Sequence, residues 1–201
     1  MNPNINIHQL QIGQRILLPV QAYISPTALN IFNTFRTLWE QHGAWTRMVI
    51  SSLIFDAPDR DYEIQRLLRN PKDFANVLRP FYGDQVANRF DELLTEHLAV
   101  AADLVNAAKA GDTMLVNEIN TIWYQNGTDI AMFLSQINPY FTFEEWQQMF
   151  FTHLDLVKEE AITLLNQEYQ RSIDVYDEME IQILEMSDMM ARGIMRQFNI
   201  T

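Results

Sequence analysis

The sequence predicts an all-α fold, an up-down-up-down four-helix bundle built from two duplicated helical hairpins. Three observations predict it. Apolar residues recur at intervals of three and four along most of the chain, the spacing of one helix face. Only six glycines and seven prolines occur in 201 residues. Residues that favour helix starts stand before the long apolar stripes.

The first long helix is predicted to start at Ser25-Pro26, because serine caps helix N-termini and proline suits the first helical turn. Two more helices are expected at about 84–110 and 113–137. A fourth starts at Thr142 in a capping-box pattern. The remaining segments are assigned as follows: an N-terminal arm at 1–24, a bundle over 25–201, an inserted short-helix cap at 56–83, and a C-terminal helix extension at 170–197.

The fourth helix is predicted to be overlong. After Thr142 no glycine or proline occurs until Gly193. A continuous helix over this stretch would be roughly 75 Å long at about 1.5 Å per residue. It would extend well past the bundle, unless it breaks near 166–172.

Two pairs of similar segments indicate an internal repeat. Residues 38–43 resemble 122–127 at an offset of 84, and residues 90–98 resemble 146–154 at an offset of 56. The offsets differ by 28, the length of the predicted cap at 56–83. This alignment pairs His42 with Asn126 and His97 with His153.

Composition excludes several classes of function. The chain has no cysteine, so a disulfide framework, a thiolate zinc site and a cysteine nucleophile are excluded. The net charge of -12 argues against nucleic-acid binding. Neither a Gly-x-Ser-x-Gly elbow nor a glycine-rich phosphate loop is present, which predicts a non-enzymatic protein. The start of the sequence lacks the pattern of a signal peptide, and a cytoplasmic protein is expected.

The charge is concentrated near the C-terminus. Residues 142–201 hold 12 acidic and four basic side chains, a net of -8, whereas residues 1–110 are nearly neutral. A basic cap and an acidic extension at opposite ends of the bundle predict a structural or interaction protein that self-associates, into rings or filaments or into a closed two-fold dimer. The arm, cap and extension are the expected contacts, with these interface residues: Arg60, Arg66, Arg69, Lys72, Arg79, Ile173, Tyr176, Ile183 and Met190.

Three histidines give an alternative function. His42, His97 and His153 lie on apolar stripes, so each is expected inside the bundle, where helical proteins build metal and cofactor sites. They could hold zinc or copper, two of them could ligate a haem, or each could be a neutral core residue hydrogen-bonded to a partner. A ferritin-like di-iron site does not fit, because Leu94 and Phe150 stand where its glutamates would be.

Arg47 is expected to form a structural ion pair across the bundle. Its predicted partners are Glu92, Glu96 or Asp103.

A resemblance covers about residues 30–197. It rests on Trp39 through Arg47, on 66–71, on Phe81-Tyr-Gly83 and on 93–98, and it extends through 102–112 and Asn138-Pro139. These residues resemble a family of small helical bacterial proteins from Gram-positive spore formers, largely uncharacterised and often labelled acetylglutamate kinase. That label is not supported by the residues, since such a kinase needs a glycine-rich loop on an α/β sheet.

Overall fold

The computed structural model describes residues 24–201, and the regular structure of this part of the chain is helical throughout. The helices are α1 (Pro26–Phe55), α2 (Arg60–Leu67), α3 (Asn70–Ala110), α4 (Thr113–Ile137), α5 (Phe143–Leu165) and α6 (Tyr169–Gln197). The all-α prediction is therefore confirmed. The arm predicted at 1–24 lies outside the described residues, except for Ile24.

Helix starts follow the side-chain caps expected from the sequence. Ser25 Oγ accepts a hydrogen bond from the backbone N–H of Ala28 at 3.1 Å, and Pro26 opens α1. Thr142 caps α5 in the same way, through a hydrogen bond from the N–H of Glu145 at 3.3 Å. These bonds satisfy N–H groups that have no partner within the helix.

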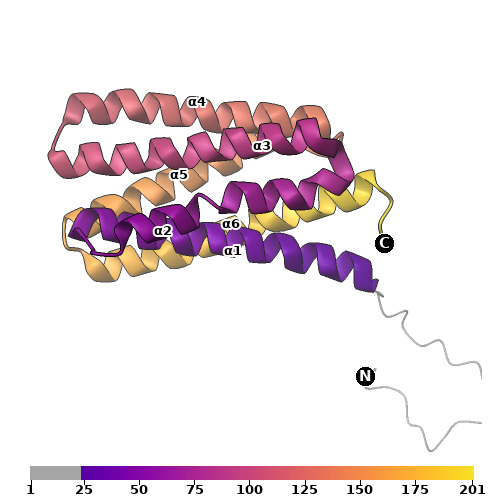
Figure 1. Cartoon of the computed structure of the whole chain (residues 1–201), viewed down its shortest axis with the longest axis horizontal. Coiled ribbons are helices and arrows are strands. Elements are labelled where there is room, and N and C mark those ends of the chain that lie inside the picture. The colour runs from indigo at the N-terminus through magenta and orange to yellow at the C-terminus, as the bar shows by residue number, and fades with distance from the viewer. Residues whose placement is uncertain (1–23) are drawn as a thin grey trace, which may run out of the picture.

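The chain runs back and forth in three helical hairpins (Figure 1). Helix α1, the second part of α3 and α5 point the same way, and the segments between them return. The reversal inside α3 occurs at Gly83, whose φ of 80° lies in the left-handed region that glycine adopts without strain. Helix α3 therefore belongs to two hairpins: residues 70–82 complete the first, and residues 84–110 begin the second.

The predicted fourth helix is not continuous. It breaks between Leu165 and Tyr169, where the sequence left a break open, and the chain turns back after α5. Gln167 has a φ of 63°, and the N–H of Glu168 donates to the carbonyl of Thr163 at 2.8 Å, a bond that closes the helix end. Neither glycine nor proline causes the break. Packing does, because α6 lies along α1 and α5 and buries an apolar stripe that an extension would leave in water.

The C-terminal extension predicted at 170–197 is therefore part of the packed helices. Ile183 and Met190 are completely buried in the core, so they are not available for an intermolecular coiled coil. Tyr176 is half-buried and Ile173 is exposed.

The segment predicted as a cap, 56–83, also belongs to the packed helices. Helix α2 and residues 70–82 lie beside α1 and bury Leu67, Phe74 and Leu78 against it. The segment carries its own apolar stripe, and this stripe is what places it along α1 instead of across one end.

The basic side chains of the same segment largely contact their own chain. Arg60 pairs with Asp56 and Asp61, Arg69 with Asp73 and Arg79 with Asp84, while Arg66 donates to Gln41 and lies over the ring of Trp45. Lys72 is exposed. Local acidic partners thus balance much of the charge that predicted a basic surface.

None of the helices between residues 24 and 201 combines the length and the apolar character needed to cross a membrane.

Candidate metal centre

The three predicted histidines meet in the middle of the molecule. His42 comes from α1, His97 from the second part of α3 and His153 from α5. Their ring centroids are 5.6–6.3 Å apart, and each side chain is only 1% exposed. One ring nitrogen from each lies within 4.8 Å of the other two. We call these three residues the His triad.

Amide side chains fix two of the three rings. His42 Nδ1 is 3.2 Å from Asn70 Oδ1, and His97 Nδ1 is 3.0 Å from Asn126 Oδ1. Each amide is itself oriented, because Nδ2 of Asn70 donates to the carbonyl of Leu38 and Nδ2 of Asn126 to that of Leu93. The oxygen therefore faces the imidazole, so Nδ1 carries the proton and Nε2 keeps a free lone pair.

The third hairpin places a longer amide, Gln182, at the corresponding position. Gln182 Nε2 donates to the carbonyl of Met149, four residues before His153, at 2.9 Å. Leu38 and Leu93 likewise stand four residues before their histidines. Among the described residues, His153 Nδ1 and Gln182 Oε1 are both buried without a hydrogen-bond partner.

A histidine and an amide thus recur three times along the chain, joined by a hydrogen bond in the first two cases. The repeat of 55–56 residues agrees with the predicted offset of 56 and not with the predicted offset of 84. The histidines follow one another after 55 and 56 residues, and Asn70, Asn126 and Gln182 follow one another after 56 and 56. The prediction paired His42 with Asn126 through the offset of 84. In the structure His42 contacts Asn70, because the returning helix of its hairpin lies within the segment predicted to be an insertion.

Burial keeps the His triad neutral at physiological pH. Loss of hydration lowers the pKa of His42 to about 4 and that of His97 to about 3. It lowers the pKa of His153 well below its ordinary value of 6.5, and the proximity of His42 and His97 adds to this effect. Neutral imidazole is the form that binds metal ions, so no proton must be displaced at neutral pH.

Aromatic side chains close the space around the rings. Trp39 contacts His42 edge-on at 5.6 Å, while Trp123 and Phe150 contact His97 at 5.4 and 6.0 Å between ring centroids. A haem between two of the histidines would have to displace these rings as well as the third imidazole. The arrangement fits a single ion better than a porphyrin.

A separate buried ion pair lies two helical turns farther along α5. Glu160 is fully buried and accepts a hydrogen bond from Arg47, which also donates to the backbone carbonyl of Ser172 at 3.1 Å and lies 4.9 Å from the ring centre of Tyr176. The prediction of a structural ion pair at Arg47 is correct in kind. Its predicted partners are wrong. Arg47 pairs with Glu160 of α5 instead, and α6 folds back so that Ser172 and Tyr176 also contact it.

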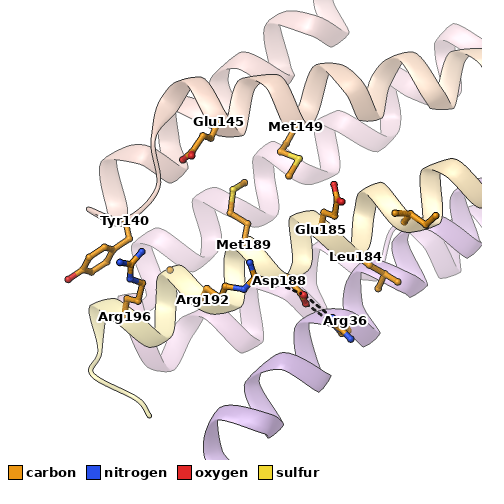
Figure 2. A pocket seen from close by; sticks show the side chains of 12 residues that line it. Arg36, Tyr140, Glu145, Met149, Leu184, Glu185, Asp188, Met189, Arg192 and Arg196 are labelled. Atoms are coloured by element: carbon orange, nitrogen blue, oxygen red, sulfur yellow. Dashed lines mark hydrogen bonds and ion pairs between the residues drawn. The ribbon is translucent and has the colours of Figure 1, made fainter. Parts of the chain in front are cut away.

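A surface pocket of about 670 Å³ lies along α6, and none of the three histidines lines it (Figure 2). Asp188 bonds to Arg36 at 2.7 Å and to Arg192 at 3.0 Å there. Arg196 lies over the ring of Tyr140. The arginines of this pocket thus have partners in their own chain, and its lining groups do not converge on a common point as the three imidazoles do.

Sequence reasoning located the three histidines but missed Asn70 and Gln182. A usable signal was present, since an amide residue stands 28 or 29 positions after each histidine. Comparison with known proteins adds no assignment: no protein family, no curated protein and no solved structure matches this chain, and the resemblance drawn from its motifs stays an expectation.

Proposed function

We propose that the protein is a metal-binding helical bundle in which His42, His97 and His153 hold one transition-metal ion. The single observation that supports this most is the convergence of three buried, neutral imidazoles with ligand nitrogens within 4.8 Å of one another. Imidazole ligands suit zinc and copper among the common metals.

The hydrogen bonds around the triad match what a metal site requires. A histidine that binds a metal through one nitrogen donates its other N–H to an acceptor, which fixes the tautomer and the ring plane. Asn70 and Asn126 provide that acceptor for two of the ligands. Zn–N bonds of ~2.0–2.1 Å place neighbouring ligand nitrogens roughly 3.4 Å apart in a tetrahedral site. Binding would therefore draw the rings inward by a small movement.

The test is metal analysis of the untagged full-length chain, with Zn²⁺ and Cu⁺ titrations monitored by thermal unfolding. We expect one ion per chain and a rise in Tm with metal, since a ligand that binds only the folded state stabilises it by about 2.7 kcal/mol at 100 times its Kd. His97→Leu should abolish both effects. His8→Ala removes the fourth histidine of the chain and is the matched control. A wild-type protein that binds neither ion, or an unchanged His97→Leu, would refute the proposal.

Self-association stays a prediction. A coiled coil through Ile183 and Met190 is not open to it, because both are core residues, whereas Lys72 and Ile173 are exposed. Light scattering at low and high salt measures it directly.

A further inference from the structure

A cavity of about 240 Å³ lies one helical turn from the His triad, although none of the three histidines lines it. Its lining includes Thr46, Ala101 and Val157, which stand four residues after His42, His97 and His153 respectively. Residues four apart share a helix face, and helical side chains lean toward the N-terminus. These three side chains therefore stand one turn from the imidazoles and also line the cavity.

The cavity is apolar, and its lining comes from α1, α2, α3 and, at Val157, α5. Apart from Thr46 and Asp103, the residues that line it carry aliphatic side chains. Asp103 is exposed and lies at the outer edge. An apolar space of this kind excludes ions and favours small uncharged molecules such as xenon.

Thr46 gives the cavity one polar group at its inner end. The residue is 5% exposed, and its Oγ1 makes no hydrogen bond within residues 24–201. A buried hydroxyl without a partner costs free energy, so an incoming ligand that accepts its hydrogen bond would be stabilised.

The charge of the surroundings favours an ion of low charge at the triad. The three imidazoles are neutral, and the side chains bonded to Nδ1 of His42 and His97 are the uncharged amides Asn70 and Asn126. The carboxylate nearest in this network, Glu96, accepts a hydrogen bond from Asn126 at 3.4 Å and is exposed. Burying a charge without compensation is costly, and the cost is smaller for Cu⁺ than for a divalent ion.

We propose that the cavity admits a small uncharged diatomic molecule, of the chemical class of dioxygen and carbon monoxide, to a Cu⁺ ion held by the His triad, and that Thr46 Oγ1 hydrogen-bonds to it. This inference rests on the proposed metal site. It adds that the site has an open fourth position with its own access route.

The experiment uses the full chain loaded anaerobically with Cu⁺, after bound copper has been measured, with carbon monoxide as the probe. We expect a single C–O stretching band in the infrared spectrum. Ala101→Leu fills the cavity one turn from the triad and should slow CO binding by roughly tenfold or more, because a packed side chain must be displaced. Ala99→Leu, the same substitution at the exposed rim, is the matched control.

Thr46→Val keeps the shape of the side chain and removes the hydroxyl, so it should shift the C–O band, whereas Thr46→Ser should retain most of the wild-type frequency. If Ala101→Leu does not fold, xenon under pressure replaces it: xenon in the cavity should slow CO binding to the wild-type chain. Rates that neither Ala101→Leu nor xenon changes would overturn the access route, and a band unaffected by Thr46→Val would overturn the role of the hydroxyl.

The outcomes separate the two proposals. A chain that binds Cu⁺ but not CO, or that takes only Zn²⁺, overturns this inference and leaves the metal site standing. A chain that binds neither ion removes both.

Discussion

Replacing Glu160 by glutamine should remove a large pH dependence of stability. Burial raises the pKa of Glu160 from 4.5 to about 7, although the charge and hydrogen bond of Arg47 act in the opposite direction. The folded protein therefore holds this proton more tightly than the unfolded chain does. The resulting stabilisation is complete below pH 4.5 and is lost as the pH rises through 7.

The size of the effect follows from the change in pKa. A rise of roughly 2.5 in the pKa, at about 1.4 kcal/mol for each pH unit, gives about 3 kcal/mol. Most of this loss should fall between about pH 5 and pH 7. Glutamine is uncharged at every pH and keeps an oxygen that Arg47 can bind, so Glu160→Gln should lack the loss.

The assay is urea unfolding of both proteins from pH 4.5 to pH 8.5, with the difference in unfolding free energy plotted against pH. Glu159→Gln removes one charge from the half-buried neighbouring position, which pairs with Arg171 near the surface, and controls for net charge. Parallel curves for wild type and Glu160→Gln would refute the reasoning. They would mean that the Arg47 pair offsets the whole cost of burying the carboxylate.

Two further predictions concern packing and the metal site. Gly193→Ala should destabilise the fold by about 1–3 kcal/mol, because the added Cβ would overlap the ring of Phe141. Gly127→Ala should stabilise the fold by about 0.5–1 kcal/mol, because its Cβ would meet Phe150 at an ordinary 3.5 Å. In urea unfolding, the midpoints of the two variants should therefore move in opposite directions. Asn126→Leu should weaken metal binding by about 10- to 100-fold, measured by competition with a chromophoric chelator, and an unchanged affinity would show that the amide does not orient His97.

The sequence predicts local structure better than it predicts where the chain reverses direction and packs against its earlier helices. Caps such as Ser25 and Thr142 are predicted correctly because their hydrogen bonds reach only three residues along the chain. The turn at Gln167 has neither a glycine nor a proline that would indicate it in the sequence. Its left-handed conformation is imposed by α6 packing on α1, an interaction between residues more than a hundred positions apart.

The same distinction explains the site. Apolar periodicity places each histidine on the apolar face of its helix, so the burial of each one could be predicted from its own helix alone. The three histidines converge only because the chain forms three hairpins instead of the predicted two. The number of hairpins follows from the chain reversals at Gly83 and Gln167, which apolar periodicity does not indicate. Asn70 is missed because it lies in the segment 56–83 that the offsets assign to an insertion, and Gln182 because it lies in the extension predicted at 170–197, outside the bundle.

The polar character of the centre is itself an argument for a ligand. Six polar side chains, three imidazoles and three amides, occupy positions where aliphatic residues would pack without loss of hydration. The amides provide a hydrogen-bond partner for Nδ1 of His42 and of His97 only, since one hydrogen bond uses one ring nitrogen. A network kept only for fold specificity would be expected to satisfy its own atoms. Here one ring nitrogen from each histidine lies within 4.8 Å of the other two, an arrangement that a single bound cation would satisfy.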